Sequence, residues 1–197
     1  MQRPSVLMGK RVHLRPPHRA DQKAFITGAR ASRTLHAGWV QAPESPPAFL
    51  AYVERFGSAG LSARYAGLLV VRNDDDALAG VFNFSEIVRG AFNSAYVGYY
   101  AFASLAGEGY MTEGFALALD FAFHRMKLHR IEANVQPGNR RSLALAERMG
   151  FEREGYSRRY VKIAGRWRDH VRFAMLAEDW QARRRELARR HAGSHGK

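Results

Sequence analysis

A glycine-rich turn, Gly107-Glu108-Gly109-Tyr110-Met111-Thr112-Glu113, constrains the fold of this chain more than any other segment. The preceding residues 96–102 are aromatic and β-prone, which predicts a strand. The following residues place apolar side chains at intervals of three or four as far as Leu128, which predicts a helix with a wide buried face. A strand, a glycine turn and a helix in this order point several unpaired backbone N–H groups at one spot, where the helix dipole also favours negative charge. The segment therefore predicts a site for a phosphorylated cofactor.

Two stricter phosphate-binding motifs are excluded. A P-loop requires Lys and then Ser or Thr directly after its last glycine, and no glycine of this chain is followed in that way. A dinucleotide-binding fingerprint requires a glycine at position 112, where Thr112 stands. Taken alone, Gly107 and Gly109 remain compatible with an ordinary turn that caps a helix.

The length and composition indicate one domain without metal or disulfide chemistry. A chain of 197 residues can bury a substantial core. The absence of cysteine excludes disulfides, a thiolate nucleophile and cysteine-based metal sites. The eight histidines are scattered, and His124 and His129 do not share a helical face, so no zinc site is predicted. No apolar run approaches the length of about 18 residues that spans a membrane, and residues 1–11 lack the apolar core of a signal peptide. We therefore expect a cytoplasmic protein without a membrane segment.

Positive charge is spread over the whole chain. The formal net charge is +13, which favours an acidic partner. Residues 181–197 hold six Lys or Arg against Glu186 alone, a net charge of +5 that leaves +8 on residues 1–180. We expect a single domain over residues 1–180 and a basic C-terminal tail over residues 181–197. The tail is either a solvated helical extension or a contact with ribosomal RNA or another polyanion.

Periodicity and turn residues predict a mixed α/β domain without internal repeats. Strands are expected at residues 10–15, 64–72, 78–84, 94–102, 129–135, 152–163 and 167–174. Helices are expected at residues 21–31, 47–58, 109–127 and 141–149, the last closed by Gly150. Residues 33–47, which contain Trp39 and three of the seven prolines, are expected to form a loop. The glycine turn then follows the fourth of seven strands.

Several further motifs accompany the glycine turn. They lie at residues 80–85, 88–90, 128–132, 139–142, 150–151 and 167–170. With these motifs the chain resembles the GNAT acetyltransferases, and within them the ribosomal-protein-alanine N-acetyltransferases of the RimJ/RimL type, with the RimJ branch nearest. The resemblance extends from about Lys10 to Trp180 and leaves the basic tail outside. It implies the GNAT fold, in which a central, mostly antiparallel sheet of six to seven strands is splayed between the fourth and fifth strands and flanked by helices.

The resemblance implies acetyl-CoA as the cofactor, with its pantetheine arm lying as a pseudo-strand in the splay. Backbone groups of the fourth strand would meet the pantetheine amides, and the glycine turn would wrap the pyrophosphate. Asn139, just before the last helix, would hydrogen-bond the pantetheine. The implied cofactor-binding residues are Tyr100, Ala101, Phe102, Ala106, Gly107, Glu108, Gly109, Tyr110, Met111, Thr112, Asn134, Asn139 and Ser142.

The resemblance also implies how the proton transfers are shared. The tyrosine acid common in the wider family falls on Ala146, which leaves Ser142 as the catalytic acid that protonates the departing thiolate. The carboxylate that RimL enzymes offer as general base falls on Val161, so Glu86, at the end of the third strand, is the candidate base. Simpler roles remain open, because Asn139 can merely cap the helix and Ser142 can hydrogen-bond its own backbone.

The absence of an evident strong base favours acceptors that are partly neutral near pH 7. A free α-amine has a pKa near ~7.7 and a lysine side chain a pKa near ~10.4, so only the α-amine is substantially deprotonated at that pH. The chemistry therefore favours N-terminal α-amines over lysine side chains. Trp39, Phe84 and Tyr99 are expected to line the acceptor side, although Phe84 is equally compatible with the core.

Three functions follow, in order of preference. The first is an acetyl-CoA-dependent N-acetyltransferase that acts on the N-terminal α-amine of a ribosomal protein, an alanine, by direct attack in a ternary complex. The second is acetylation of a small amine, such as an antibiotic, a polyamine or an aminoacyl nucleotide. The third is a non-catalytic ribosome-assembly factor that binds RNA through its basic surface and tail, a reading opposed by Asn139, Ser142 and the glycine turn. A monomer and a homodimer are equally compatible with the sequence.

Overall fold

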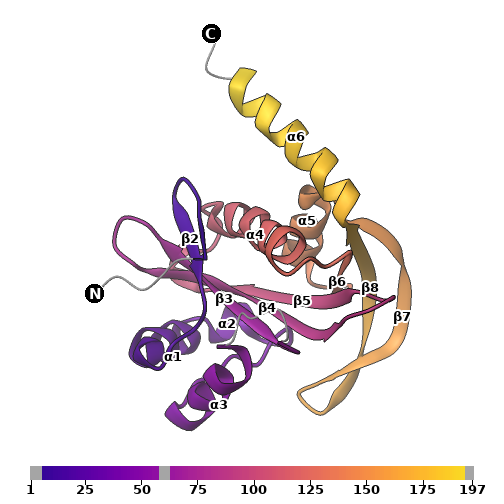
Figure 1. Ribbon diagram of the computed structural model, residues 1–197. Coiled ribbons are helices and arrows are strands. Elements are labelled where there is room, and N and C mark those ends of the chain that lie inside the picture. Colours follow the sequence, from indigo (N-terminus) through magenta and orange to yellow (C-terminus); the bar gives the residue numbers. More distant parts are fainter. Residues whose placement is uncertain (1–5, 58–62, 194–197) are drawn as a thin grey trace.

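Eight strands form one mixed sheet at the centre of the molecule. The computed structural model describes residues 6–57 and 63–193 (Figure 1), so Ser58 of the second predicted helix and the last four residues of the predicted tail lie outside the described residues. The strand order is β1-β2-β3-β4-β5-β6-β8-β7, and only β5 and β6 are parallel neighbours. The strands are β1 (Leu7–Met8), β2 (Val12–Arg15), β3 (Ala66–Arg72), β4 (Leu78–Val88), β5 (Ser94–Ala101), β6 (Arg130–Val135), β7 (Glu152–Ile163) and β8 (Arg166–Leu176). The predicted mixed sheet is confirmed, with one strand more than expected because the two-residue β1 pairs with β2.

The sheet opens between β5 and β6. These strands pair at three positions only, Ser94↔Arg130, Ala95↔Ile131 and Tyr96↔Glu132. Beyond Tyr96, β5 continues to Ala101 and β6 continues to Val135 without pairing to each other. The splay predicted between the fourth and fifth expected strands is therefore confirmed, and it leaves backbone groups of both strands without a strand partner on that side.

Helices cover both faces of the sheet (Figure 1). The helical segments are η1 (Arg19–Asp21), α1 (Gln22–Ala31), α2 (Arg33–His36), α3 (Pro46–Phe56), η2 (Ala103–Leu105), α4 (Tyr110–Asp120), the π-helical η3 (Phe121–Arg125), α5 (Arg140–Met149) and α6 (Ala177–Gly193). The larger core lies under α4 and contains the fully buried Phe82 and Phe115. A smaller core lies under α1 and α3 and contains Phe25, Phe49 and Val81. Val81 and Phe82 are neighbours on β4, so the alternation of a strand supplies one side chain to each core.

Local signals set the helix ends that position the site. At the start of α3, the Ser45 hydroxyl accepts a hydrogen bond from the Ala48 N–H at 3.4 Å, and Pro46 occupies the first helical position. α5 ends at Gly150, whose φ of 89° closes the helix as predicted.

Three predicted elements differ from the structure. The loop expected at residues 33–47 contains the one-turn helix α2, and the long helix expected after the glycine turn becomes π-helical beyond α4. β4 does not end at Phe84 but continues to Val88 through a bulge, in which Glu86 has a φ of 48°. A bulge interrupts the two-residue alternation of a strand, and the sequence pattern therefore hides the continuation.

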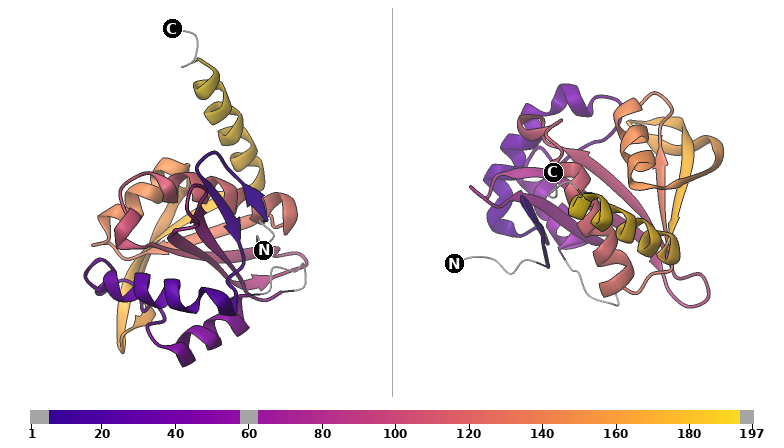
Figure 2. Two further views of the ribbon diagram at one scale, coloured as in Figure 1. Left: turned by 90° about the vertical axis from the view of Figure 1, so that its left-hand side faces the viewer. Right: turned by 90° about the horizontal axis from the view of Figure 1, so that it is seen from above.

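The basic tail begins as a helix that is attached to the domain. Trp180 Nε1 donates to Asp120 Oδ1 at 2.9 Å, and Arg184 Nη2 lies 3.0 Å from Asp120 Oδ2. Arg183 Nη2 donates to the Arg148 carbonyl at 3.0 Å. Beyond these contacts α6 projects away from the sheet (Figures 1 and 2), so the boundary expected before the tail falls inside one helix. None of the helices in the described ranges combines the length and the apolar character needed to cross a bilayer.

Candidate active site

The glycine turn lies between β5 and α4, as the sequence predicts. Gly107 and Gly109 have φ values of 92° and 86°, in the left-handed region that favours glycine. Gly109 is also the N-cap of α4 and has no side chain that could bond the first helical N–H groups. The N–H groups of Thr112 and Glu113 reach the Gly109 carbonyl at 3.0 and 3.2 Å.

The turn exposes backbone donors at the positive end of α4. The N–H groups of Tyr110 and Met111 belong to the first helical turn, whose donors have no partner within the helix. The N–H of Ala106 donates to the Ala103 carbonyl at 3.3 Å, and that of Thr112 donates to the Gly109 carbonyl. These two N–H groups are therefore less available to a ligand than those of the residues between them. Free donors at a helix N-terminus suit an anion such as a diphosphate.

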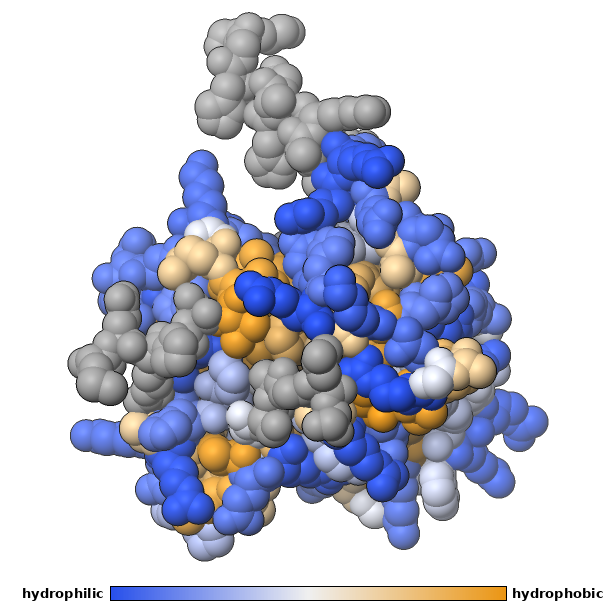
Figure 3. All heavy atoms as spheres, in the orientation of Figure 1, coloured by the Kyte–Doolittle hydropathy of each residue, from blue (hydrophilic) through white to orange (hydrophobic). Residues whose placement is uncertain are grey.

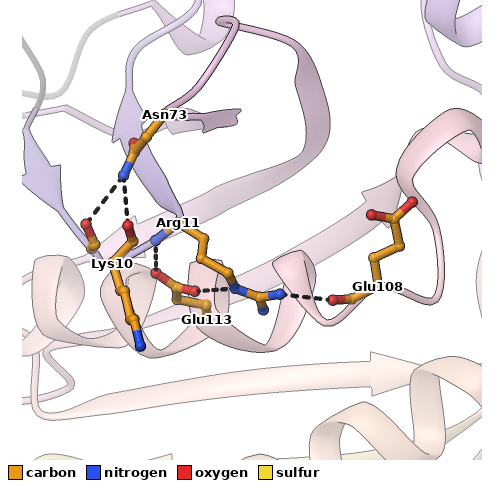
Figure 4. A network of polar contacts seen from close by, with 6 residues as sticks. Lys10, Arg11, Asn73, Glu108 and Glu113 are labelled. Carbon is orange, nitrogen blue, oxygen red and sulfur yellow. Dashed lines mark hydrogen bonds and ion pairs between the residues drawn. The ribbon is translucent and has the colours of Figure 1, made fainter.

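Arg11, the residue before β2, lies beside this turn (Figure 4). Its backbone N–H donates to Glu113 Oε1 at 2.8 Å, and its Nε donates to Glu113 Oε2 at 3.1 Å. Its Nη1 donates to the Glu108 carbonyl at 3.1 Å, and its guanidinium lies 4.8 Å from the centre of the Tyr110 ring. With 48% of its side chain exposed, Arg11 is a solvent-accessible cation at the glycine turn. Sequence reasoning missed it, because it lies 102 residues from Glu113 and in no motif.

The edge of β5 that faces the splay is formed by Tyr99 and Ala101. The N–H of Phe102 donates to the Ala79 carbonyl of β4, and its carbonyl accepts from Leu105, so Phe102 cannot offer its backbone to a cofactor as predicted. Backbone groups of an antiparallel strand alternate between its two neighbours. Tyr100 therefore turns its groups to β4, and Ala101 is the one residue of the three predicted here that faces the gap.

The Ala101 carbonyl already has a protein partner in His36. His36 Nε2 lies 2.8 Å from that oxygen, and because a carbonyl only accepts, Nε2 carries the hydrogen. The His36 ring is buried and packs edge-on against Tyr100, with 5.1 Å between ring centres. His36 stands in the segment expected to be a loop, where no sequence pattern distinguishes it. It fixes the strand edge at the point where the sheet opens.

Two amide side chains lie along the other wall of the splay. Asn134 on β6 has a buried Oδ1 without a hydrogen-bond partner among the described residues. Asn139 Oδ1 accepts from the Ser142 N–H at 3.2 Å and so caps α5, which is the simpler of the two roles considered for it. The capping bond leaves the Asn139 amide nitrogen for a further contact.

Tyr99 joins the two walls of the splay. Its hydroxyl, on β5, donates to the carbonyl of Ser142 on α5 at 2.8 Å. Burial raises the pKa of Tyr99 well above its ordinary value, so this hydroxyl stays protonated and remains a donor. The half-buried Ser142 is thereby linked to β5 across the opening, and its N–H is held by the Asn139 cap. The Tyr99 ring packs 4.9 Å from that of Phe115 on the α4 face of the sheet.

Trp39 lies against the β6–α5 loop. A Cβ atom at Gly138 would approach the Trp39 ring to 3.1 Å, and Gln136 Nε2 donates to the Gly38 carbonyl at 2.9 Å. The exposed fraction of Trp39 is 36%, so its ring is both packed and accessible. Phe84, by contrast, is fully buried and packs 6.2 Å from Phe121, so the prediction that it lines the acceptor side is wrong and it belongs to the core.

The Glu86 carboxylate is occupied by two local hydrogen-bond partners. Arg64 Nη2 donates to its Oε2 at 2.7 Å, and the Tyr65 hydroxyl donates to its Oε1 at 2.8 Å. These hydrogen bonds, from Arg64 first, lower the pKa of Glu86, which weakens it as a base. Glu86 lies in the bulge beside the closed end of the β5–β6 pair.

His170 on β8 is an ionisable group that sequence reasoning left without a role. Its Nδ1 lies 3.0 Å from the Arg168 carbonyl, so Nδ1 carries the hydrogen and Nε2 keeps its lone pair. Burial lowers the pKa of His170 below its ordinary value, which keeps the ring neutral near pH 7. The ring lies 5.9 Å from that of Tyr160, whose hydroxyl is 3.5 Å from the Tyr96 hydroxyl. Tyr96 is the last β5 residue paired with β6. The side chains of Tyr96, Tyr160 and His170 therefore lie in a row that begins where the sheet opens.

Known proteins resemble both the sequence and the fold. A family model described as an acetyltransferase (GNAT) domain matches residues 11–152. The [Ribosomal protein uS5]-alanine N-acetyltransferase of Escherichia coli (strain K12) is 41% identical over 138 residues, which cover 70% of each chain. A probable N-acetyltransferase of Bacillus subtilis (strain 168), YjcK, is 46% identical over 105 residues, or 53% of this chain and 58% of that protein. The structure of Mycobacterium smegmatis RimJ in complex with CoA-disulfide matches with a TM-score of 0.80 and 28% identity, covering 90% of both chains. The chain therefore belongs to the GNAT acetyltransferases, which use acetyl-CoA as acetyl donor, as the resemblance of its motifs implies.

Proposed function

We propose that the chain transfers an acetyl group from acetyl-CoA to the N-terminal α-amine of a ribosomal protein, with alanine as the preferred first residue. The observation that carries the proposal is the open splay between β5 and β6, with the uncapped start of α4 beyond the end of β5 and, on β6, the buried Asn134 Oδ1, which has no partner among residues 6–57 and 63–193. The printed name of the Escherichia coli relative, an alanine N-acetyltransferase of ribosomal protein uS5, supports this choice of acceptor.

The residues along the splay fit acetyl-CoA. The first N–H groups of α4 and the Arg11 guanidinium favour its phosphates, and the buried Asn134 Oδ1 can accept from an amide of its pantetheine arm. The N–H of Ala101 and the free amide nitrogen of Asn139 complete the polar lining. Bound there, acetyl-CoA supplies an activated acetyl thioester.

Ser142 and Tyr99 serve the departing sulfur. Ser142 holds a proton on Oγ at the open end of the splay, where we assign it the role of catalytic acid. The Tyr99 hydroxyl, by bonding to the Ser142 carbonyl at 2.8 Å, fixes the first turn of α5 and with it the position of Oγ. Tyr99 is in this sense a positioning residue.

The acceptor amine needs a group that takes its proton. Glu86 is the candidate from sequence, but Arg64 and Tyr65 already occupy its carboxylate and lower its pKa. The neutral His170 ring, with Nδ1 committed to Arg168, keeps a lone pair on Nε2. The buried ring packs beside Tyr160, whose hydroxyl meets that of Tyr96 at the opening of the sheet. We therefore place His170 ahead of Glu86 as general base, acting directly or through one water.

Two mass-spectrometric experiments test the proposed function. Ribosomal proteins from strains with and without the gene are compared by intact mass. In the strain without the gene, one protein should be lighter by the mass of a single acetyl group, and fragmentation should place the missing acetyl group at its N-terminus. In vitro, a peptide with a free N-terminal alanine should be acetylated, whereas the same peptide blocked at its α-amine and carrying a free lysine should not. Acetylation of both peptides at similar rates would contradict the α-amine specificity.

A further inference from the structure

A basic hairpin lies at the edge of the sheet beyond the candidate site. We call residues 156–168 the basic ribbon; they form the distal part of the β7–β8 hairpin, which extends past the neighbouring strands in Figure 1. This segment contains no Asp or Glu, and its five cations are Arg158, Arg159, Lys162, Arg166 and Arg168. All of them but Arg168 are exposed. On the face seen in Figure 3, hydrophilic side chains dominate the side on which β7 lies.

Exposed rings lie among these cations. Trp167 is 59% exposed and Tyr156 is 48% exposed, so two large aromatic rings meet solvent beside the cations of the ribbon. Trp167 is paired with Lys162 across the hairpin, so the indole ring and an ammonium group share one face of the ribbon. Charge alone would protect an edge strand from pairing with other sheets, but such protection gives no reason to expose a tryptophan.

Asp169 fixes the shape of the ribbon. The pairing of β7 with β8 shifts between Ser157 and Val161, where Arg159 has a φ of 48°. The Arg159 N–H donates to Asp169 Oδ1 at 2.7 Å, and the Tyr156 hydroxyl donates to Oδ2 at 2.5 Å. The carboxylate beside the ribbon is thus bound to the ribbon itself, and the bulge holds a defined twist.

We propose that the basic ribbon binds a single-stranded segment of RNA, with its cations at the phosphates and Trp167 stacked on a base. Cationic side chains with exposed aromatic rings are the means by which proteins hold single strands, because every base has a face on which a ring can stack. The ribbon borders the splay, since Tyr160 on β7 reaches the Tyr96 hydroxyl. RNA on the ribbon would therefore lie next to the acceptor opening, as a substrate embedded in a ribonucleoprotein requires. The choice of RNA among polyanions rests on the proposed function.

A binding titration tests the ribbon directly. Anisotropy of a fluorescein-labelled 12-nucleotide oligouridylate is followed at several salt concentrations with the full chain and with the variant Arg158→Ala/Lys162→Ala/Arg166→Ala. We expect weaker binding and a salt slope of log K smaller by about 2, because each phosphate contact on a single strand contributes about 0.7. Trp167→Ala should weaken binding about tenfold, whereas Trp167→Phe, which keeps a stacking ring, should retain most of the affinity.

A matched variant away from the ribbon separates site binding from net charge. Arg19→Ala/Lys23→Ala/Arg125→Ala also removes three exposed cations and should weaken binding much less than the ribbon variant. Equal losses in the two triple variants would overturn the proposal, as would equal affinity for a duplex of the same length. It would also be overturned if Trp167→Ala left RNA affinity unchanged but altered the oligomeric state by sedimentation, because the ribbon would then be an interface between copies of the chain. The ribbon variants should acetylate a short N-terminal peptide at the same rate as the parent chain. If the parent chain did not acetylate this peptide, the proposed function would be rejected, whereas the measured RNA affinities would still decide whether the ribbon binds RNA.

Discussion

Gly107 and Gly109 have similar backbone angles but differ in their surroundings. A Cβ atom at Gly107 would meet no atom within 4 Å, so backbone conformation alone calls for glycine there. At Gly109 a Cβ atom would also lie 3.1 Å from Arg11 Nη2, in addition to the strain of a φ of 86°. Gly109 thus combines a required conformation with close approach to a cation of the anion site, and a side chain there should disturb both.

Replacement of Gly109 by valine should abolish cofactor binding while leaving the fold intact. In the parent chain, coenzyme A should raise the melting temperature, because a ligand that binds the native state stabilises it. The Gly109→Val variant should lose this shift. Gly90→Val is the matched control, because Gly90 has a φ of 74° with open space around it and lies at the β4–β5 turn, far from α4. An unchanged coenzyme A shift in Gly109→Val would remove the turn from the cofactor site.

Ser142 should affect the rate and not the affinity. If its hydroxyl protonates the departing sulfur, Ser142→Ala lowers kcat while the dissociation constant of acetyl-CoA stays nearly constant, because the interaction arises only as the sulfur departs. The Asn139 cap accepts from the backbone N–H of residue 142 and so survives the substitution. Steady-state kinetics together with calorimetric binding measure the two quantities separately. A kcat unchanged within about twofold would reduce Ser142 to a helix residue, with water as the proton donor.

Paired substitutions at His170 separate its hydrogen bond from its basicity. Asparagine places an amide N–H near the position of Nδ1 and keeps the bond to the Arg168 carbonyl, whereas glutamine places its amide near Nε2. We expect His170→Asn to lower kcat by about tenfold to a hundredfold with little change in melting temperature. Glu86→Gln should leave kcat within about twofold, because the pKa of Glu86 is already lowered by Arg64. The opposite outcome, with Glu86→Gln the slower variant, would return the base to Glu86.

At the scale of elements, the sequence predicts what depends on local pattern. The strand–turn–helix at the glycine turn, the strand that follows the long helix and the final hairpin all have periodicities and turn residues of their own, and each is present. Two features escaped because neither produces a complete local pattern. The bulge at Glu86 breaks the alternation that would have shown β4 continuing, and α2 is too short to produce a helical period.

Contacts between distant segments were likewise beyond the sequence. Arg11 reaches Glu113 and the Glu108 carbonyl only because the β1–β2 hairpin packs against α4, and Asn73 holds that hairpin through the Gly9 and Lys10 carbonyls, both at 3.2 Å. These contacts join residues that are far apart in the sequence, so no spacing pattern indicates them (Figure 4). For the same reason Phe84 was misassigned, since a strand pattern does not state which face of the sheet lies under α4.

Removal of Arg11 should loosen the turn and weaken cofactor binding. Arg11→Ala loses the bond to the Glu108 carbonyl and the cation beside the first turn of α4, so we expect a several-fold higher KM for acetyl-CoA with kcat nearly unchanged. Arg11→Lys should restore part of the affinity through its charge but not through the forked contact with Glu113. Arg19→Ala, a substitution of another exposed arginine, is the control for net charge. A fall in kcat without a change in KM would mean that Arg11 acts on the reaction and not on the turn.

At the scale of the molecule, the sheet consists of two halves that meet at three residue pairs of β5 and β6. Side chains bridge the opening beyond these pairs: Tyr99 reaches Ser142 on one face, and Gln136 reaches the Gly38 carbonyl beside Trp39. Under the proposed function, in which Trp39 lines the acceptor side, the bridge at Trp39 would restrict the space beside the incoming amine. Such a restriction would favour a narrow acceptor, such as a chain terminus with a small first side chain, over a bulky one.

The dependence of the rate on pH should follow the acceptor amine. Near the site, burial lowers the pKa of His170, Arg64 lowers that of Glu86, and burial raises that of Tyr99. His170 is then neutral, Glu86 charged and Tyr99 protonated throughout the range of about pH 7 to 8.5, so none of the three titrates where an α-amine does, near ~7.7.

The rate of acetylation of a peptide with N-terminal alanine should rise across this range with a midpoint at the pKa of its own α-amine. A second acceptor whose α-amine has a different pKa should shift the midpoint by the same amount, which pH–rate profiles of kcat/KM measure. A midpoint that stays fixed when the acceptor is changed would assign the titration to the enzyme, and efficient acetylation of an internal lysine in an α-blocked peptide would require a base stronger than any of these residues.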